Sequence, residues 1–589
     1  MIIEQDAFSD GLDLISPDVQ VSTTGFIWLA NGRSRYGYVQ PVAQPVKDIA
    51  APSGLKQGII SIGNAVIMFV AGNAWYKLHN SKQWIQVPAF SMSPTVPNIY
   101  SCAIPVSSRN YNRKLNSSGS VTDAMLLSTN SRPSGTPSGI VCQDGNSQPW
   151  IIVFDEVEQI FSARQLNTFA NWTPTNGEYV PIGLFMMFMN QKLFIVAPDR
   201  QSVYQSISGQ PLNFALNVNT AGWPNGNSTI APYAPLTGVG TEEEYGAAST
   251  SFAFDYDPIT CLQPVNVTDS FIYATKNNTY AITLNYNLTV FGEPLFTRAA
   301  SIATGITNQY ALIDINGDYA FVGREGIRNF NAVQALKFEG RNSVFSKMVS
   351  KLFNGLVQDY AVAFSFNNYS IFNVDTVCGN LCAVYDTISG KWVALDLFDV
   401  GKITQTALID LTSQVVLYAI TDTNDVYQLY NTDAAPMQPF LLTRAYSTIG
   451  INQYYSGIAS YANMSAAAGP ITEIKSQKID LIFRDGTTDG KVWCTEFCNG
   501  VEKATVSKTL SKASPVTNYA LLPAIQPLVE SEGQRITFNF NNTSRGFKLG
   551  YAITWNTDAA LMKVRLVTTD ISKGTSDNQR TAVLSGNQT

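Results

Sequence analysis

The chain has 589 residues, of which 45% are hydrophobic and only 14% are charged, and its formal net charge is −6. Soluble proteins usually carry about 25% charged residues, so much of the polarity here comes from uncharged Asn, Gln, Ser and Thr side chains. There is no basic block of the kind that marks nucleic-acid-binding proteins, and no apolar run reaches the ~20 residues of a membrane-spanning helix. Abundant aromatic residues and glycines, with few helix-forming residues, favour an all-β protein.

The N-terminal sequence precedes the first repeated unit, and we assign residues 1–50 to an N-terminal arm or platform segment. Its opening, MIIEQDAFSDGLDL, has neither the positive region nor the apolar region of a secretory signal. We therefore expect synthesis in a cytosol without export by that route.

Short β-meanders begin with residues 57–88, where the turn pairs Gly63-Asn64, Gly72-Asn73 and His79-Asn80 separate apolar strands. A second unit, residues 183–214, contains the most apolar seven-residue run of the chain, GLFMMFM. This run is too short to cross a membrane. It is followed by Asn190-Gln191, where a tight reversal is expected, and then by the strands KLFIVA and QSVYQSI.

Similar units recur every 40 to 60 residues or so, and each combines an apolar strand, a polar turn and an aromatic-bearing strand. Asn-Gly is the strongest short hairpin signal. Small sheets of this kind cannot bury both faces alone, so they must stack or close into a ring. The pattern predicts a β-propeller of roughly 6–7 blades over residues 51–470, with stacked β-sandwiches as the alternative. The further turns are expected at Asn277-Asn278, Asn316-Gly317, Glu325-Gly326, Asn367-Asn368, Ser389-Gly390 and Thr423-Asn424.

Several regions depart from the repeat. Loop insertions are expected at about 105–148 and 215–260, because both are rich in polar and turn-forming residues. A helix is expected at about 342–354, where apolar residues recur at helical intervals. From residue 471 the strands become longer and alternate, so we assign residues 471–589 to a C-terminal β-sandwich-like or platform domain. The apolar residues of the expected helix are Phe345, Met348, Val349, Leu352 and Phe353.

Few residues in the sequence suit acid–base or nucleophilic catalysis. The single histidine, His79, lies in a polar turn, whereas Ser-His-Asp catalysis needs a positioned histidine base and most histidine-based zinc sites need more than one histidine. No GxxxxGK[ST] or GxGxxG loop follows a strand and opens a helix. Two carboxylates suffice for glycoside hydrolysis, but adjacent acids on a loop usually form a hydrated surface. The acidic candidates are Glu242, Glu243 and Glu244, Asp255 with Asp257, and Asp155 with Glu156.

The segment Asp314–Asp318 (DINGD) partly matches a calcium-binding loop, but the hairpin turn at Asn316-Gly317 explains it better. We therefore predict that the protein is not an enzyme. We assign no catalytic, cofactor-binding or metal-binding residues and expect no cofactor.

The seven cysteines include two pairs with CxxxC spacing, Cys378 with Cys382 and Cys494 with Cys498. Positions i and i+4 of a strand lie about 13 Å apart, which is too far for a disulfide or a shared ion. We interpret these residues as buried small hydrophobic side chains. A turn near Gly379-Asn380 would bring the first pair closer, so free, bridged and metal-bound states all stay open.

The N-terminal segment QDAFSDGLDLISPDVQVSTTGFIWLANGRSRYGYVQPV resembles the opening of tail nozzle proteins (muzzle, or tail tubular B-type, proteins) of short-tailed phages. Later passages resemble the same family in the same order, including NQKLFIVAPDRQSVYQSISGQPLNF, SFIYATKNNTYAI, YAFVGREGIRNF and, near the end, TSRGFKLGYAITW. The strand rhythm is also similar to that of propeller sialidases, but their Ser-x-Asp-x-Gly-x-Thr-Trp boxes are missing. The N-terminal positions that carry the nozzle resemblance are Gly11, Leu12, Asp13, Leu14, Pro17, Asn31, Arg33, Arg35, Gly37 and Pro41.

The resemblance implies a structural virion protein of the phage tail, made in the host cytoplasm. It implies a homo-oligomeric ring, commonly hexameric, at the distal end of the tail around the channel through which the genome leaves. Expected partners are other subunits, adaptor or ring proteins, tail fibres, the host surface and viral DNA that passes without sequence-specific binding. Few Lys or Arg residues fit such passage, because they are what grips phosphate. The alternatives are a tail-borne propeller that binds or hydrolyses host-surface glycan, and a cellular adhesion or lectin-like propeller.

Overall fold

A computed structural model of the chain describes residues 2–570, apart from six longer gaps and several gaps of at most four residues. The regular structure of the described residues is almost entirely β, with one 3₁₀ helix of seven residues, η5 (Lys347–Phe353). No helix in this part of the chain has the length and apolar character of a membrane span. The longer gaps are residues 106–137, 167–179, 215–251, 331–344, 447–473 and 513–533.

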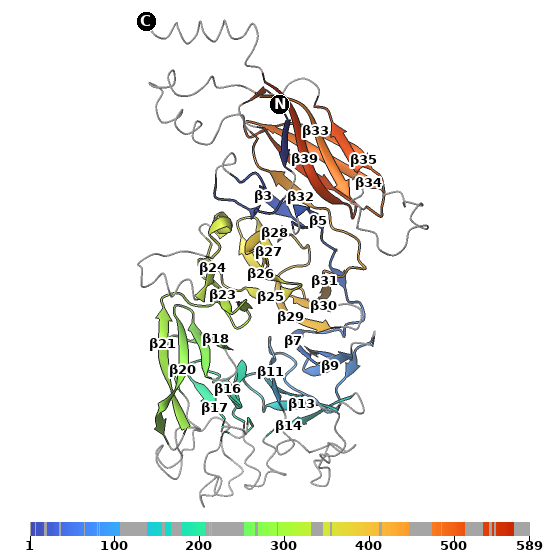
Figure 1. Ribbon diagram of the computed structural model, residues 1–589. Coiled ribbons are helices and arrows are strands. Elements are labelled where there is room, and N and C mark those ends of the chain that lie inside the picture. Colours follow the sequence, from blue (N-terminus) through green and yellow to red (C-terminus); the bar gives the residue numbers. More distant parts are fainter. Residues whose placement is uncertain are drawn as a thin grey trace, which may run out of the picture.

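Seven small antiparallel sheets, numbered here as blades 1 to 7, lie around a common axis and form a β-propeller (Figure 1). In blades 1 to 6 the first strand along the chain is the innermost, whereas in blade 7 the innermost strand is β29 (Ile403–Asp410) and the N-terminal strand β6 (Val46–Lys47) is the outermost. Inner strands of neighbouring blades contact each other around most of the ring, and Gln309 links blades 4 and 5 through Leu262. The ring closes where β29 of blade 7 contacts β7 (Lys56–Ile62) of blade 1. The predicted propeller is therefore confirmed, with seven blades in the described residues.

The blades differ in size, because the described residues give blades 3 and 5 three strands and the others four. The strands are, in blade 1, β7, β8 (Ala65–Val70), β9 (Asn73–Leu78) and β10 (Ile85–Gln86); in blade 2, β11 (Tyr100–Pro105), β12 (Ser138–Gln143), β13 (Trp150–Asp155) and β14 (Ile160–Gln165); in blade 3, β15 (Met186–Met189), β16 (Lys192–Val196) and β17 (Val203–Gln205); in blade 4, β18 (Ile259–Pro264), β19 (Ser270–Thr275), β20 (Thr279–Val290) and β21 (Glu293–Ile302). They are, in blade 5, β22 (Leu312–Ile315), β23 (Asp318–Gly323) and β24 (Gly326–Asn329); in blade 6, β25 (Val362–Phe366), β26 (Tyr369–Thr376), β27 (Gly379–Asp386) and β28 (Lys391–Asp396); and in blade 7, β29, β30 (Val415–Thr421), β31 (Val426–Leu429) and β6 (Val46–Lys47).

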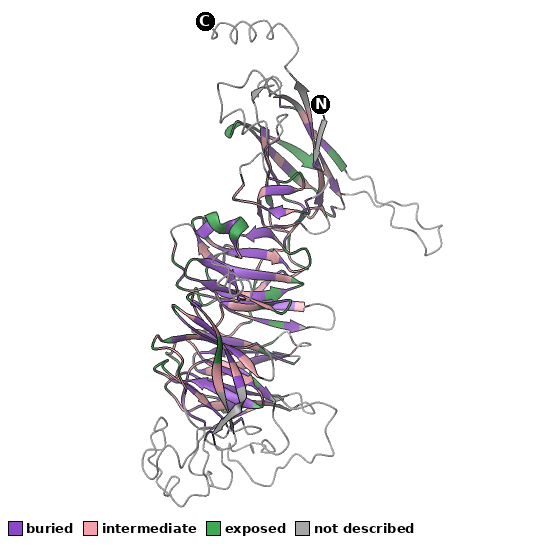
Figure 2. Ribbon diagram, turned by 60° about the vertical axis from the view of Figure 1, so that its left-hand side comes forward, coloured by how far each residue is buried: buried purple, intermediate pink, exposed green. Residues whose placement is uncertain are grey.

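Apolar side chains fill the spaces between neighbouring blades, and buried residues run along the strands (Figure 2). The run in β15 shows how this works, because Met186 packs toward blade 2 while Phe185 and Met187 pack toward blade 4. Both faces of this strand are buried, so the run is continuously apolar instead of alternating. Burying one such side chain contributes roughly 1.5–3 kcal/mol, which explains why a blade is stable only between two others.

The hairpin turns use residues that tolerate a left-handed backbone. Asn190 and Gln191 have φ values of 49° and 58°, and Asn316 and Gly317 have 54° and 89°, as two-residue hairpins require. One turn of blade 1 differs from the expectation by one residue: it is Ala71-Gly72 and not Gly72-Asn73. Gly72 fits because its φ is 79° and a Cβ would lie 2.5 Å from the Met92 carbonyl oxygen.

Two expected irregular regions need correction. The insertion expected at 105–148 contains a strand, β12, which pairs along its whole length with β11. The strand was not predicted because the surrounding sequence is rich in polar and turn-forming residues. Residues 106–137 of the expected insertion lie outside the described part. The helix expected at 342–354 is present as the short 3₁₀ helix η5, with Val349, Leu352 and Phe353 buried and Met348 exposed.

The C-terminal part is a sandwich of two sheets, as predicted, and lies at the rim of the propeller beside blade 6 (Figure 1). Phe483 and Trp555 meet between the sheets with ring centroids 5.3 Å apart. Strand β32 lies within the range 51–470 that we expected for the propeller, but it pairs in this sandwich. One sheet contains β1 (Ile2–Gln5), β39 (Ala560–Asp570), β33 (Ile474–Arg484), β36 (Gln534–Phe538) and β37 (Arg545–Gly546); the other contains β3 (Gly25–Ala30), β32 (Phe440–Thr443), β38 (Leu549–Trp555), β34 (Gly490–Cys498) and β35 (Val501–Leu510).

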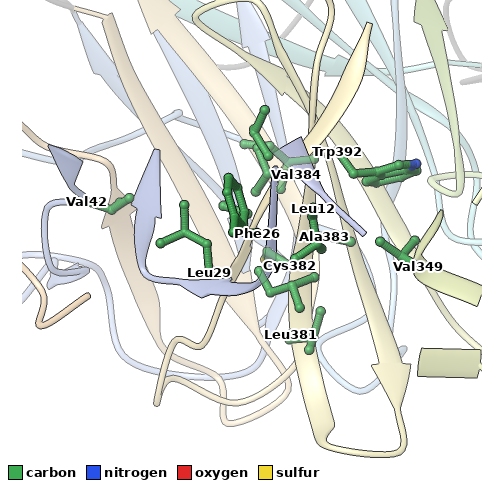
Figure 3. Packing of buried hydrophobic residues seen from close by; sticks show 14 of the residues in the cluster. Leu12, Phe26, Leu29, Val42, Val349, Leu381, Cys382, Ala383, Val384 and Trp392 are labelled. Atoms are coloured by element: carbon green, nitrogen blue, oxygen red, sulfur yellow. The ribbon is translucent and has the colours of Figure 1, made fainter. Parts of the chain in front are cut away.

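The N-terminal segment joins the two parts of the molecule. Strand β1 pairs with β39 of the sandwich, β3 pairs with both β28 of blade 6 and β32, and β6 is the outermost strand of blade 7. Two further short pairings, β2 (Gly11–Leu12) with β3 and β4 (Gly32–Arg33) with β5 (Gln40–Pro41), complete the segment. Figure 3 shows its residues Leu12 and Phe26 against blade 6.

Neutral amide side chains bridge the blades at the free inner edges of the sheets. Gln309, ahead of blade 5, bonds both backbone groups of Leu262 in blade 4: it accepts from the N–H and donates to the carbonyl, each at 2.9 Å. An amide can do this because it carries a donor and an acceptor. The other amide bridges are Gln143 to Pro181 and Gly183, Asn308 to Ala361, Asn373 to Ile403, and Gln405 to Ile59.

Replacing Gln309 with methionine keeps the side-chain volume but leaves two backbone groups of Leu262 without their partner. We expect a loss of about 1–3 kcal/mol in the free energy of unfolding, measured by urea denaturation. Gln438→Met is the matched control, because Gln438 donates to Thr554 Oγ1 at an exposed position, and it should change stability little. Equal stability of the two variants would contradict the bridging role.

Asp48 directly follows β6 of blade 7, and its side chain binds blade 1. Its Oδ2 accepts from Lys77 Nζ at 3.2 Å and from Trp84 Nε1 at 3.0 Å, so it links the last blade of the ring to the first.

Asp48→Ala leaves the largely buried Lys77 ammonium without its carboxylate. We expect the free energy of unfolding to fall by about 3–5 kcal/mol in thermal or urea denaturation. Asp425→Ala, which breaks the more exposed pair with Lys47, should cost less than about 1 kcal/mol. A mild effect at both positions would show that ring closure does not depend on Asp48.

Candidate functional site

A cavity of about 470 Å³ lies on the propeller axis, and the inner strands of all seven blades contribute to its wall. Its lining is aromatic, amide, hydroxyl and aliphatic, and no Lys, Arg, His, Asp or Glu side chain is among the lining residues. Its size is in the range of about 300–1,000 Å³ that is typical of small-molecule pockets. The cavity is the main candidate site for a ligand in the described part of the chain.

The cavity offers binding groups but little chemistry. Burial raises the pKa of the Cys102 thiol to about 12, so this cysteine stays protonated at neutral pH and is a poor nucleophile. Burial also raises the pKa of Tyr310 well above its ordinary value, with smaller contributions from Tyr360 and Tyr100. The Tyr310 hydroxyl therefore acts as a neutral hydrogen-bonding group.

The acidic candidates of blade 4 hold loops in place. Asp255 Oδ2 accepts hydrogen bonds from Asn278 Nδ2 at 2.9 Å and from Tyr280 Oη at 2.8 Å, and Asp257 Oδ2 accepts from Asn277 Nδ2 at 2.6 Å. Burial acts to raise the pKa of Asp255, but the bonds from Asn278 and Tyr280 outweigh it and lower the pKa. These carboxylates anchor the segment before β18 to the β19–β20 hairpin.

The remaining acid–base candidates lie outside the described residues or side chains. This applies to His79, Glu156 and Glu242–Glu244, and to the side chain of Asp155. The DINGD segment forms the expected hairpin, in which the Gly317 N–H donates to Asp314 Oδ1 at 2.8 Å.

All seven cysteines are free thiols. Cys382, Cys494 and Cys498 are buried and Cys378 is exposed, so three residues of the two CxxxC pairs fit the interpretation as small hydrophobic side chains. In the described part of the chain, no group of three or more His, Cys, Asp or Glu residues could hold a metal ion.

The N-terminal positions that carried the family resemblance meet blade 6 at a buried ion pair. Arg33 donates to both oxygens of Asp396 at 2.7 and 2.5 Å, and Tyr430 Oη donates to Asp396 Oδ2 at 2.7 Å. The guanidinium also lies over the rings of Tyr369 and Tyr430, 5.2 and 5.1 Å from their centroids. Burial opposes the charged form of Arg33, but Asp396 outweighs it and raises the pKa.

Other residues of this N-terminal segment bind the same blade. Asp10 pairs with Lys391 Nζ at 2.5 Å and accepts from the hydroxyls of Ser22 and Thr24. These bonds, led by that from Lys391, lower the pKa of Asp10 to about 2. Gly11 has a φ of 75°, and a Cβ there would overlap the Trp392 carbonyl oxygen. Pro17 and Arg35 lie outside the described residues.

Sequence reasoning missed Asp396 and the amide bridges. Asp396 is an isolated acid in the apolar sequence WVALDLF, and its position at the end of a buried strand was a usable signal, because buried carboxylates need partners. The high proportion of uncharged polar residues was noted, but their role between blades depends on pairings distant in sequence.

The sequence matches no protein-family model and no curated protein. Among solved structures, the chain is similar to the β-propeller domain of Myceliophteria thermophila Cps50 (Swd1), with 9% identity over 67% of this chain and 100% of that chain, and a TM-score of 0.35. It is also similar to the C-terminal WD40 domain of Sif2, with 10% identity over 69% and 95% of the two chains and a TM-score of 0.31. These similarities are too low to carry an argument, so the fold assignment stands on the strand pairings alone.

Asp396→Asn should destabilise the junction strongly, because it leaves the buried Arg33 guanidinium without a carboxylate. We expect a loss of about 3–5 kcal/mol in the free energy of unfolding, measured by urea denaturation. The control is Asp375→Asn, which removes the charge from the half-exposed pair with Lys402 and should cost less than about 1 kcal/mol. Similar midpoints for both variants would refute a special role for the Arg33–Asp396 pair.

Proposed function

We propose that this chain is a structural subunit of the tail nozzle of a short-tailed phage and that it assembles into a homo-oligomeric, sixfold ring around the genome exit channel. The observation that carries the proposal is a coincidence of sequence and architecture. Two of the N-terminal residues that resemble the nozzle family, Asn31 and Arg33, fasten the segment that follows strand β3 of the sandwich to the end of blade 6. Asn31 Oδ1 accepts from the Leu397 N–H at 2.8 Å, and Arg33 pairs with Asp396.

The continuity of the sheets also supports a structural role. Blade 6 continues through β3 into one sheet of the sandwich, so ten strands form one hydrogen-bonded sheet that runs from the propeller axis to β35. A contact of this kind resists relative motion better than a flexible linker does. A subunit that holds its neighbours while DNA passes needs such rigidity.

The proposal places genome passage on the axis of the ring of subunits and not on the axis of one propeller. The propeller cavity has a volume of only about 470 Å³. A sphere of that volume is about 10 Å across, which is narrower than the major groove of DNA alone, about 12 Å wide. Hydrolysis of glycan, an alternative function, finds no support at Asp255 and Asp257, because both carboxylates are committed to amide and hydroxyl donors.

Cryo-electron microscopy of isolated virions tests the proposal. We expect density for a seven-bladed propeller with an attached sandwich, repeated around the tail axis at its distal end, and the chain in the mass spectrum of purified tails. The sandwich should face the adjoining tail components. Purified particles that lack the chain, together with a chain that stays monomeric when produced alone, would refute the proposal.

A further inference from the structure

The cavity on the propeller axis contains hydrogen-bonding side chains that no described protein group satisfies. The hydroxyls of Tyr100 and Tyr310 have no hydrogen-bond partner among the described residues, and the same holds for the side chains of Ser101, Gln263 and Thr406. These five residues come from blades 2, 4, 5 and 7 or their inner edges. Neutral donors and acceptors therefore converge on one space from several directions.

Tyr310 is half-buried and belongs to the lining of this space. Burial raises the pKa of its hydroxyl well above the ordinary value, so the hydroxyl is a neutral donor and acceptor for a ligand there. By contrast, Tyr360 Oη, which adjoins Tyr310, donates to the Thr404 carbonyl at 2.6 Å and is already satisfied.

The lining selects against charged ligands. None of the lining side chains is ionised at neutral pH, because the one thiol, Cys102, has a pKa of about 12. An ammonium or carboxylate in this cavity would lose its hydration without gaining a counter-charge. A neutral ligand avoids this cost.

The lining also favours a ligand over water alone. Tyr100, Phe188 and Tyr310 bring aromatic surface to the same cavity as the unsatisfied polar groups. Water would satisfy the polar groups but would leave the aromatic surface hydrated, which is unfavourable. A pyranose has an apolar C–H face and a rim of hydroxyls, so it can cover the rings and bond the polar groups together.

We infer that the propeller cavity binds a small neutral saccharide. Tyr310, Tyr100 and Gln263 bond its hydroxyls, and the aromatic rings cover its apolar face. The site is independent of the proposed place in a phage tail, because it lies within a single chain and needs no ring of subunits.

Ligand-observed NMR and calorimetry on the purified full chain test this inference. The probes are glucose, galactose, N-acetylglucosamine and maltose at up to about 50 mM, since a few neutral hydrogen bonds correspond to a dissociation constant near 1 mM. Charged counterparts, glucosamine and glucuronate, should bind at least about tenfold more weakly than glucose, because each buries an uncompensated charge. Absence of binding by all four neutral sugars would overturn the inference.

Two variants place the binding in the cavity. Tyr310→Phe and Gln263→Met each remove hydrogen-bonding groups with little change in volume, and each should weaken sugar binding about fivefold to tenfold. Tyr256→Phe is the matched control, because Tyr256 is 99% exposed, and it should bind as the unaltered chain does. Thermal unfolding confirms that the variants fold. Unchanged sugar binding in both cavity variants would show that the sugar binds elsewhere and would refute the inference. The test of the proposed function, the presence of the chain in virions, does not depend on this result.

Discussion

The contact between neighbouring blades is the constraint on which the rest of this structure depends. A blade of three or four strands has two apolar faces and a free inner edge, and neither can face water or an empty axis without cost. Apolar clusters between successive blades bury the faces. Amide side chains such as Gln309 and Gln405 satisfy edge groups of the adjoining blade. An amide needs no counter-charge when buried, which gives the low charge and high content of uncharged polar residues a structural reason.

Local features of the fold could be predicted, whereas its closure could not. The hairpins at Asn190-Gln191 and Asn316-Gly317 follow from residues that tolerate positive φ, and the continuous apolar run of β15 follows from burial on both faces. The blade number did not follow, because blades 3 and 5 have three described strands and β12 lies in a polar region. Closure depends on β6, whose two residues, Val46 and Lys47, pair with Gln428 and Tyr427. Such a short strand has no periodicity to detect, and its partner is distant in sequence.

The candidate sites divide in the same way. The hairpin signal at Asn316-Gly317 explains Asp314 from the sequence alone, and in the structure its carboxylate accepts a hydrogen bond from the backbone of that turn. Asp255 was interpreted as part of a hydrated surface, but its partners Asn278 and Tyr280 lie more than twenty residues later and are brought to it by the β19–β20 hairpin. The axial cavity was not predicted at all. Its wall is assembled from one to four residues of each of seven blades, so no single segment of the sequence carries more than a small part of it.

The buried pair of Arg33 and Asp396 fixes the orientation of the sandwich relative to the propeller. Replacing a buried ion pair by well-packed apolar residues is often neutral or stabilising, so stability alone does not account for it. Its position suggests another reason: β28 and β3 are joined by a single parallel pairing, Leu395 with Ala30, and one pairing fixes register weakly. A bidentate guanidinium–carboxylate contact at the next residue of β28 is directional, and Tyr430 adds blade 7 to it. The pair thus sets the orientation of the sandwich on the propeller, and the ring that we propose would need the same orientation in every copy.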